Sequence, residues 1–587
     1  MKKILFIVLL GLAASLHAQS VLYPSGGYKE LSDPATIDTE KWDKQSDGIH
    51  FAWGSTDVRY AKSNIPATFS NKKVQVLSGW KGEKVNAQMV LWSKQEQREI
   101  TLRCSDLRDK QGNVIRASSI TTGFVRYVMT DELDKSGKSG CGKRPDKTKF
   151  DSLLVADPID PVSVFLLSPR TVCPVWLNVK IPHTAVSNIY EGKVAIYSGK
   201  QEVGRVGLKL KVGKRTLPAP SQWQFHLDLW QNPFAVARYY QTGLWTKEHF
   251  EAMRPVMKAL ADAGQKVITA SIMHKPWNGQ TYDAFESMVT WTRKVDGSWH
   301  FDFDVFDKWV EFMMDTGIDK QINCYSMVPW AFSFQYFDQA TNRMQIIKTK
   351  LGEQAYNEIW LTLLKSFAKH LKEKGWFEKT VIAMDERPLQ DMIKVESLIK
   401  KADPDFKLSL AGLYYEEIDK DIYDYCLSTD QVFPMEALKR RKAEGKISTY
   451  YTYCADTKPN TFTFSEPAEA AWIGIYAAAL NLNGYLRWAY NSWTESPLTD
   501  SRFISWAAGD TYLVYPGFRS SIRFERLIEG IQDYEKIRIL REYYDQKKDS
   551  HKLMQIDKML SEFNLKNLSK DSIVESVKSM RKLLNSL

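Results

Sequence analysis

Two patterns of hydrophobic and polar positions divide the chain. Between residue 19 and residue 216, short runs of alternating apolar and polar residues are separated by Gly, Asn, Asp and Lys turns. Such runs are typical of strands with one buried face, and the clearest are 73–77, 87–92, 99–102, 175–179, 193–197 and 207–212. Their spacing predicts a β-sandwich domain over residues 19–216. The polar, Gly-rich stretch 131–149 is predicted to be a long loop.

After the Pro-rich segment 217–221, a predicted stiff linker, apolar strands alternate with amphipathic helices. Helices are expected at 247–263, 354–374 and 466–482, with Gly or Asn near their ends. The expected strands are 224–230, 266–272, 321–327, 380–386, 407–414, 431–433, 446–453 and 484–490. This alternation predicts a (β/α)8 barrel of the TIM type over residues 222–517. An insertion at 288–304 is expected to form a hairpin that turns at Asp296-Gly297.

The last part of the chain, residues 518–587, shows helical periodicity over 522–545, 553–563 and 573–584. Charged residues alternate with Leu, Ile and Tyr, and no residue pattern there indicates chemistry. We therefore predict a C-terminal helical segment that packs on the barrel. Arg523 and Glu525 are expected to form a structural pair beneath the barrel rim.

The first 18 residues have the pattern of a signal peptide. Lys2 and Lys3 precede an apolar core over 4–14, and Leu16-His17-Ala18 is a candidate cleavage site. A signal anchor is the alternative interpretation. No Cys follows the cleavage site, so a lipid anchor is not expected, and no later stretch is long and apolar enough to span a bilayer. We predict export to the periplasm or outside the cell.

Charge and composition exclude several function classes. The formal net charge of +10 is mild for 587 residues, and no basic cluster resembles a nucleic-acid footprint. Nucleic acid is therefore not an expected partner. No set of His, Cys and Asp residues has metal-ligand spacing, so no metal and no cofactor are predicted.

The six cysteines are too few to staple a chain of this length. Cys324 and Cys454 lie in apolar runs and are expected to be buried free thiols. One bridge among Cys104, Cys141 and Cys173 is left open.

Tryptophans gather in the barrel half of the chain. Fourteen of the 19 lie between Trp223 and Trp506. A flat apolar ring with a polar N–H suits sugar rings as well as cores. We therefore expect some of these tryptophans to line a cleft.

The fourth expected barrel strand ends in two acids. The apolar run 381–384 is followed by Asp385 and Glu386, and Pro388 then prevents further strand pairing. In α/β barrels, active sites lie at the carboxyl ends of the strands. The position of this pair makes it a candidate catalytic site, whereas Asp131-Glu132 lies in a predicted polar loop.

The other strand ends are expected to face the same mouth. They supply aromatic and amide side chains and few charges, which suits an uncharged polyhydroxylated ligand such as a sugar. The candidates are His226, Asp228, Trp230, His274, Tyr325, Tyr451, Tyr453, Trp488, Tyr490, Asn491 and Trp493. His226 and His274 have a structural interpretation as well.

Glycoside hydrolysis normally uses two carboxyl groups that flank the bond. Adjacent residues of an ideal strand point to opposite faces, so Asp385 and Glu386 do not flank one bond unless the strand end twists. A 2-acetamido group on the substrate offers another route, because its carbonyl oxygen attacks the anomeric carbon and the protein supplies an acid and an orienting carboxylate. The seventh expected strand favours this route, since it carries tyrosines and no carboxylate, and its nearest acid is Asp456.

Three stretches carry a resemblance to a known family. They are 381–388 with its Asp-Glu pair, 484–493 (Gly-Tyr-Leu-Arg-Trp-Ala-Tyr-Asn-Ser-Trp), and 509–517 (Gly-Asp-Thr-Tyr-Leu-Val-Tyr-Pro-Gly) running into 521–535. In these stretches the chain resembles glycoside hydrolase family 123, the exported bacterial β-N-acetylgalactosaminidases. A β-sandwich before the barrel also agrees with this resemblance.

The resemblance implies hydrolysis of terminal β-linked N-acetylgalactosamine with retention, through the acetamido group. It implies that Glu386 is the general acid/base and that Asp385 orients and stabilises the acetamido group. Tyr451 or Tyr453 is expected to contact the acetamido oxygen, with Trp488 and Trp493 forming walls of the pocket. A terminal glycan of a glycolipid or oligosaccharide is the expected partner.

Two other classes of function stay open from the sequence. One is a glycan-binding barrel protein without catalysis. The other is a β-hexosaminidase or β-glycosidase with a different sugar preference, since that preference depends on contacts to a single hydroxyl group. An aryl-glycoside panel separates these classes from the leading hypothesis.

Overall fold

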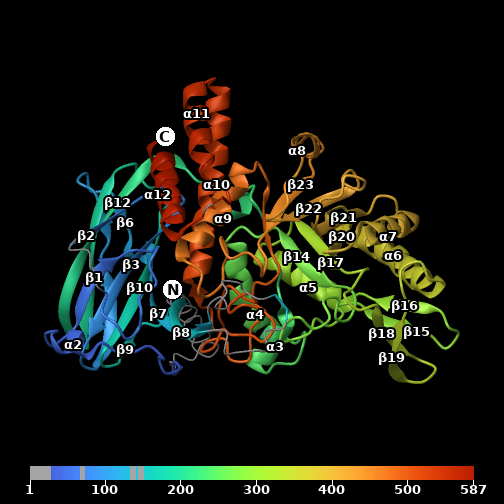
Figure 1. Cartoon of the computed structure of the whole chain (residues 1–587), viewed down its shortest axis with the longest axis horizontal. Helices are drawn as coiled ribbons and strands as arrows, with labels where there is room; N and C mark the ends of the chain where they lie inside the picture. The colour runs from blue at the N-terminus through green and yellow to red at the C-terminus, as the bar shows by residue number, and fades with distance from the viewer. Residues whose placement is uncertain (1–27, 67–72, 132–140, 143–150, 567) are drawn as a thin grey trace, which may run out of the picture.

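The computed structural model describes residues 28–66, 73–131, 141–142, 151–566 and 568–587. Figure 1 shows a strand-rich part at one end, a barrel with helices at the other, and C-terminal helices between and above them. The predicted long loop at 131–149 and the candidate signal peptide lie almost entirely outside the described residues.

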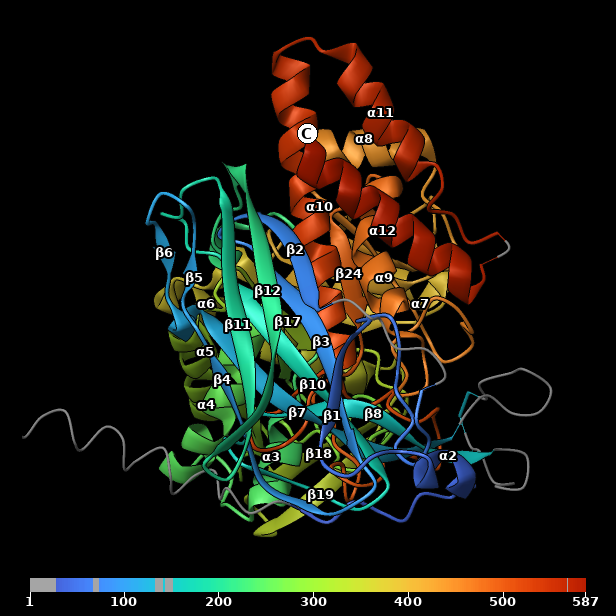
Figure 2. The same ribbon diagram turned by 90° about the vertical axis from the view of Figure 1, so that its left-hand side faces the viewer.

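The N-terminal part contains two sheets with apolar side chains packed between them. Figure 2 views their strands from the side of the molecule opposite the barrel. One sheet follows the order β1 (His50–Gly54), β3 (Lys84–Ser93), β10 (Thr171–Lys180), β7 (Ile120–Asp131), β8 (Ser152–Asp160) and β25 (Ser520–Ser521). The other follows β2 (Val74–Lys81), β12 (Gln201–Thr216), β11 (Ile189–Ser198), β4 (Gln97–Cys104) and β9 (Phe165–Leu167), with β5 (Leu107–Arg108) and β6 (Val114–Ile115) beside β11. All six strands predicted from alternation are present.

Eight parallel strands form the barrel. Their order is β13 (His226–Leu229), β24 (Gly484–Arg487), β23 (Ile447–Tyr451), β22 (Ile422–Ser428), β21 (Lys407–Gly412), β20 (Thr380–Asp385), β17 (Gln321–Tyr325) and β14 (Val267–Ser271). A bridge between Leu227 and Gln265 and a backbone hydrogen bond from Lys266 to Leu227 nearly close the ring. The predicted fold class is therefore confirmed, and the strand carboxyl ends meet at one mouth.

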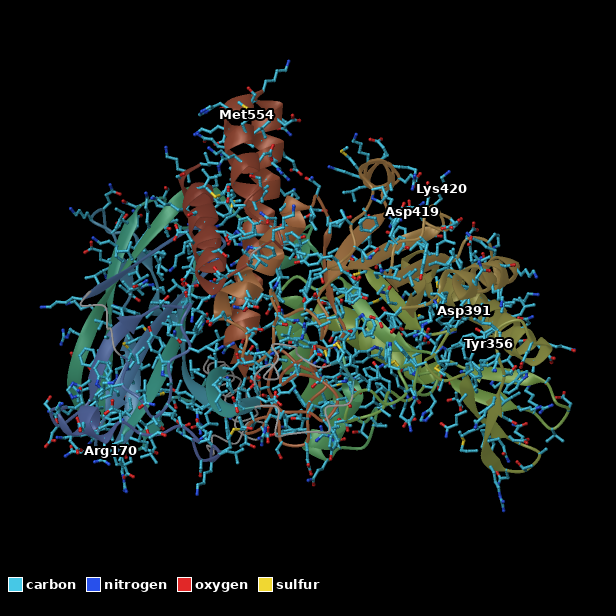
Figure 3. The ribbon with its side chains drawn as sticks, viewed as in Figure 1. Arg170, Tyr356, Asp391, Asp419, Lys420 and Met554 are labelled. Atoms are coloured by element: carbon cyan, nitrogen blue, oxygen red, sulfur yellow. A yellow bond between two sulfur atoms is a disulfide. The ribbon has the colours of Figure 1, made fainter. Side chains whose placement is uncertain are left out.

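The sixth strand was predicted in the wrong place. The structure forms it from Ile422–Ser428, whereas 431–433 is a loop before Pro434 and α8 (Met435–Ala443). The buried Arg441 of α8 fixes this arrangement, since it pairs with Asp419 at 3.2 Å and donates to the carbonyls of Ile422 and Ile447. Figure 3 labels Asp419 below α8.

The helices that cover the barrel are α3 (Pro233–Tyr240), α4 (Lys247–Ala261), α5 (Asp304–Thr316), α6 (Gln354–Lys374), α7 (Leu389–Ala402), α8 and α9 (Pro467–Ala479). Helices α5 and α6 end at Gly317 and Gly375 in the left-handed conformation, which glycine adopts without strain. Almost all of α9 is buried, because it lies between the barrel and the C-terminal helix α10 (Ile522–Gln546). A Cβ on Gly474 would lie 2.3 Å from the backbone of Gly530, so two glycines allow these helices to touch.

A small sheet extends from the barrel beside the mouth. The predicted hairpin is present as β15 (Thr290–Arg293) and β16 (Trp299–Asp302), with Gly297 at positive φ in the turn. A second hairpin, β18 (Ser333–Asp338) and β19 (Arg343–Lys348), pairs with it and was not predicted. Its preceding loop carries Trp330, which enters the site described below.

The C-terminal segment is helical as predicted, with α11 (Ser550–Leu560) and α12 (Lys570–Ser586) after α10. Figure 3 labels Met554 at the tip of α11. The expected Arg523–Glu525 pair is wrong. Arg523 instead bonds Asp157 of the sandwich at 2.9 Å, and Glu525 pairs with Lys84 at 2.6 Å, because both side chains face the interface between the parts.

The structure also corrects the cysteine predictions. Cys141 and Cys454 form a disulfide across 313 positions, so Cys454 is not a free thiol. Cys324 is a buried free thiol as predicted, and Cys104 and Cys173 are free as well. Sequence order gave no signal for this bridge, because it joins the loop after β7 to the loop after β23.

Candidate active site

Asp385, the last residue of β20, is held between two tryptophans. Nε1 of Trp277 donates to Oδ1 at 3.2 Å, and Nε1 of Trp330 donates to Oδ2 at 3.1 Å. Each carboxylate oxygen therefore has a fixed donor, and the side chain is only 8% exposed. Trp277 packs in turn against Trp230 and Tyr325, with ring centroids at 4.9 Å and 5.0 Å. This side of the mouth is a packed aromatic cluster that holds one oriented carboxylate.

The surroundings of Asp385 shift its titration. Burial raises the pKa of this carboxyl to about 6, while Arg387 and the two indole N–H groups oppose the rise. The Arg387 guanidinium lies 4.4 Å from the Trp330 ring, and its Nε donates to the Asp385 carbonyl at 2.6 Å. Burial is the largest of these effects, so the pKa of the Asp385 carboxyl lies above its usual range.

Glu386 leaves the strand in an unusual backbone conformation. Its φ is 50°, in the left-handed region that non-glycine residues adopt at a cost of ~1–2 kcal/mol. Strained residues of this kind cluster at functional sites. On the next strand, Gly412 provides the space for this turn, because a Cβ there would lie 3.3 Å from the Glu386 Cα.

This conformation removes the objection that adjacent strand residues point apart. The Tyr451 hydroxyl, at the end of β23, donates to Glu386 Oε1 at 3.0 Å. Because β21 and β22 lie between β20 and β23, the Glu386 carboxylate must extend across the mouth to reach Tyr451. Burial and the neighbouring Glu386 hold the pKa of Tyr451 well above its usual range, so Tyr451 stays a neutral donor.

A hollow of about 350 Å³ opens beside Glu386. Asp385 and its two tryptophans are not among the residues that line it. The lining residues are Glu386, Arg387, Pro388, Gly412, Leu413, Tyr415, Ser428, Asp430, Tyr451 and Tyr453. The two acids of the strand end therefore have different surroundings, buried aromatic rings around Asp385 and an open hollow beside Glu386.

The seventh-strand tyrosines separate as strand alternation requires. Tyr450 points outward and donates to the Ile473 carbonyl of α9 at 2.7 Å, whereas Tyr451 faces the mouth. Tyr453 lines the hollow, with its ring 6.1 Å from that of Tyr451. Its backbone N–H donates to Asp456, whose pKa burial raises to about 6. No carboxylate comes from β23 itself, as the sequence predicted.

Asp228 lies in the barrel interior and not in the mouth. It is 2% exposed and accepts from Asn323, which precedes Tyr325 by two residues and so belongs to the layer below it. Burial, with a contribution from Asp424, raises the pKa of Asp228 well above its usual range. We therefore correct its assignment from substrate contact to a buried carboxyl of the barrel core. Tyr325 itself belongs to the aromatic cluster around Trp277.

Two further predicted contact residues are structural. Asn491 is fully buried and exchanges hydrogen bonds with the backbone of Asn232, the N-cap of α3. Trp493 is also fully buried, packs against Tyr239, and donates to the Val514 carbonyl at 2.8 Å. Both lie beyond the end of β24, where the chain turns back into the core instead of continuing along the mouth.

Trp488 and His274 lie in loops that follow barrel strands. Trp488 is half-buried, donates to Asp510 at 3.3 Å, and packs edge-on against Trp506 at 5.5 Å. His274 pairs with Glu286 at 2.7 Å in the loop after β14. A role for either residue in substrate binding stays a prediction.

Several residues of the site were missed from the sequence. Trp277 and Trp330 were not named, although each directly follows a proline within six residues of a barrel strand end. This repeated Pro-Trp pattern could have indicated both residues as candidates for the site. Asp430, in contrast, could be placed only once the sixth strand was correctly located.

Among the residues that the structure describes, no group of three or more His, Cys, Asp or Glu side chains is arranged to hold a metal ion. Over the same ranges, no helix has both the length and the apolar character that crossing a bilayer requires.

A parallel barrel whose fourth strand presents two acids to an aromatic mouth defines a class, the barrel glycoside hydrolases. The comparisons agree with that class. The model for the glycoside hydrolase 123 catalytic domain matches residues 230–540, and the model for the family 123 N-terminal domain matches residues 53–198. The chain therefore belongs to glycoside hydrolase family 123.

A solved structure supports the same assignment. A family 123 glycoside hydrolase from Clostridium perfringens, described in terms of glycolipid glycan hydrolysis, superposes with a TM-score of 0.82 at 28% sequence identity, covering 92% of this chain and 97% of that one. A family 39 glycoside hydrolase from Bacteroides cellulosilyticus is much less similar, with a TM-score of 0.32 and 10% sequence identity. That match covers 69% of this chain and 80% of the other. No curated protein matches the sequence.

Proposed function

We propose that this glycosidase releases terminal β-linked N-acetylgalactosamine with retention, using the 2-acetamido group of the substrate as the nucleophile. In this mechanism Asp385 orients the acetamido N–H and stabilises the charge of the oxazoline-type intermediate. Glu386 protonates the leaving oxygen and then activates water. The terminal sugar would lie at the barrel mouth beside these two acids.

One observation carries this proposal most directly. Two indole N–H groups fix the carboxylate of Asp385, while its neighbour Glu386 turns at φ 50° to reach Tyr451 across the mouth. A carboxylate held in this way suits orientation of an amide, and an exposed one beside a hollow suits proton transfer to a leaving group. Family membership and the absence of a carboxylate on β23 agree with this division of roles.

We also propose that the chain is exported, by virtue of the basic and apolar pattern of residues 1–18. We propose that the substrate is a glycan of a glycolipid or of an oligosaccharide. The similar Clostridium perfringens enzyme is described in terms of glycolipid glycan hydrolysis.

The test compares Glu386→Gln, Asp385→Asn and the wild type on 4-nitrophenyl N-acetyl-β-galactosaminide, its gluco isomer and the plain galactoside. Each variant should lose ~10²–10⁴-fold in kcat/KM on the N-acetyl substrate, the usual value of general acid–base catalysis. Glu378→Gln is the control, because Glu378 precedes the opposite end of β20 and its side chain is 84% exposed.

Near-normal turnover by Glu386→Gln would refute the acid assignment. Binding of N-acetylgalactosamine without any release of sugar would indicate a glycan-binding protein. Preferred hydrolysis of the gluco isomer or the plain galactoside would indicate a glycosidase of other specificity.

A further inference from the structure

Exposed apolar side chains gather at one end of the barrel. In the described barrel residues, the short segments that lead from a helix into the next strand expose no large apolar side chain, whereas several segments that follow a strand do. One group follows β21 and β22, where Leu413, Val432 and Met435 are 48%, 70% and 69% exposed. We call these three side chains the rim patch. Because β21 pairs with β20, the rim patch lies on the strand ends next to Asp385 and Glu386.

The rim patch has a rigid base. The Tyr414 ring packs against the buried Phe433 ring, with centroids at 5.9 Å, and so joins the segments after β21 and β22. The Tyr425 hydroxyl donates to the Leu413 carbonyl at 2.7 Å and accepts from the Tyr415 N–H at 2.7 Å. Side chains on a base that is already ordered lose little freedom when they bind. Exposed apolar patches of this kind mark interaction surfaces.

Carboxylates flank the rim patch on both segments. Glu416 and Glu417 follow Leu413, and Asp430 precedes Val432 by two residues. All three acids are exposed, and none forms an ion pair with a residue that the structure describes. The half-buried rings of Tyr414 and Tyr415 lie on the same segment.

The cations of these elements are engaged or lie elsewhere. Lys439 and Arg440 of α8 are held in ion pairs. Lys420 lies two residues before β22 begins, and Lys442 lies near the end of α8, so both are toward the amino ends of the strands. The rim patch is therefore apolar with an acidic border, which disfavours an anionic lipid surface.

A zwitterionic lipid surface fits this border. Its outermost group in choline lipids is a quaternary ammonium, which binds favourably beside carboxylates and aromatic rings. Apolar side chains beside that border can then enter the lipid layer, where affinity grows with the apolar area inserted.

We propose that the rim patch docks on a lipid surface with choline headgroups. The three apolar side chains enter the lipid layer, and the flanking carboxylates face the choline ammonium groups. Docking brings the hollow beside Glu386 to the glycan of a glycolipid in that surface, a step that rests on the proposed function. The membrane-bound glycolipid is then the substrate class that the barrel mouth serves.

The experiment measures how much protein sediments with vesicles of phosphatidylcholine, alone or mixed with phosphatidylserine. Wild type should bind the phosphatidylcholine vesicles, and phosphatidylserine should weaken this binding. The variant Val432→Ser/Met435→Ser should partition ~10- to 100-fold more weakly, because it removes most of the inserted apolar area. Neither side chain lines the hollow, so kcat/KM on soluble 4-nitrophenyl N-acetyl-β-galactosaminide should stay within ~3-fold of wild type.

The matched control is Ile393→Ser/Met554→Ser. Ile393 on α7 and Met554 on α11 are 40% and 61% exposed and lie outside the rim patch. This variant should bind vesicles as wild type does. With a glycolipid that bears terminal β-linked N-acetylgalactosamine in phosphatidylcholine vesicles, the rim-patch variant should release sugar ~10-fold more slowly than this control.

Absence of wild-type binding to phosphatidylcholine vesicles, or equal binding by the rim-patch variant, would overturn the proposal. Tighter binding on addition of phosphatidylserine would overturn it too. A wild-type dimer that the rim-patch variant dissociates, as seen by light scattering, would assign the patch to a second copy of the chain instead. Failure of the proposed function looks different, because wild type would then release no N-acetylgalactosamine from the soluble aryl substrate, whatever its vesicle binding.

Discussion

Asp385 combines a buried carboxylate with two donors that favour its charged form. Each indole N–H stabilises the anion and so lowers the pKa, against the larger effect of burial that raises it to about 6. The proposed role needs the anion. The profile of kcat/KM against pH should therefore lose activity as the pH falls through about 6.

The variant Trp330→Phe removes one of the two donors and keeps a ring over which Arg387 can lie. Loss of the donor disfavours the anion, so the pKa of Asp385 should rise and the acid limb should move to higher pH. The measurement is the pH profile on the aryl substrate. An unchanged or downward-shifted limb would contradict this account of Asp385.

Asp456 titrates in the same window, because burial raises its pKa to about 6 as well. The Asp456→Asn variant therefore separates the two groups. If Asp385 is responsible, this variant keeps the acid limb near pH 6.

Neighbouring tyrosines provide a second pair of residue-scale variants. Tyr451→Phe removes the donor to Glu386 and should lower kcat/KM by ~10-fold with little change in denaturation temperature. Tyr450→Phe removes a buried bond to the Ile473 carbonyl, so it should cost ~1 kcal/mol of stability and leave kcat/KM near the wild-type value. Exchanged phenotypes would show that the two side chains had been assigned to the wrong faces.

At this scale the sequence predicted the acids but not their geometry. Strand alternation placed Asp385 and Glu386 on opposite faces, and the φ of 50° that overrides it depends on space left by Gly412 of another strand. Alternation did hold for Tyr450 and Tyr451, because β23 stays regular to its end. The predicted substrate contacts of Asn491 and Trp493 were wrong, because the chain after β24 turns into the core.

At the scale of elements, seven of the eight barrel strands could be located from apolar runs. The sixth could not, because β22 carries Asp424 and Tyr423 among its apolar residues, and Arg441 from α8 satisfies its carbonyls from outside. The second hairpin of the side sheet was missed because β19 is mostly exposed, so its apolar residues do not form a buried face.

The loop after β23 gives the element-scale prediction. The Cys141–Cys454 disulfide anchors this loop at Cys454. The residue before it, Tyr453, lines the hollow. Cys141→Ser and Cys454→Ser should each lower the denaturation temperature by a few degrees, since the bridge limits the unfolded chain.

The double variant Cys141→Ser/Cys454→Ser should match either single variant, because all three remove one bond. The measurement is thermal denaturation in the absence of reductant, with Cys104→Ser as the control for loss of a free thiol. A double variant with the summed effect of the singles would show that the bridge is not formed.

At the scale of the whole molecule, the sandwich shares buried charges with the C-terminal helix α10. Asp157 of β8 accepts from Arg523 of α10 at 2.9 Å and from Arg59 at 3.1 Å, and Arg523 is 1% exposed. Strand β25 also joins the sandwich sheet from the C-terminal side. The three-part organisation could be predicted from hydrophobic patterning, but these contacts could not, because they join residues hundreds of positions apart.

Removing one partner of this cluster should destabilise both parts together. Asp157→Asn leaves Arg523 buried without its countercharge, which typically costs ~3–5 kcal/mol. Urea denaturation followed by tryptophan fluorescence measures this loss. Asp315→Asn is the control, since its pair with Arg254 is exposed on both sides and should be worth under ~1 kcal/mol. Equal effects of the two substitutions would contradict the coupling of the sandwich to α10.

The central claim is that the acetamido group of the substrate performs the attack while Asp385 orients it and Glu386 supplies the proton. The most direct measurement is kcat/KM on aryl β-galactosaminides whose N-acetyl group carries no, one, two or three fluorine atoms. Fluorine withdraws electrons from the carbonyl oxygen, so the account predicts a steep fall along the series, by orders of magnitude at the trifluoroacetyl member. A flat series, or equal turnover of the plain galactoside, would contradict it.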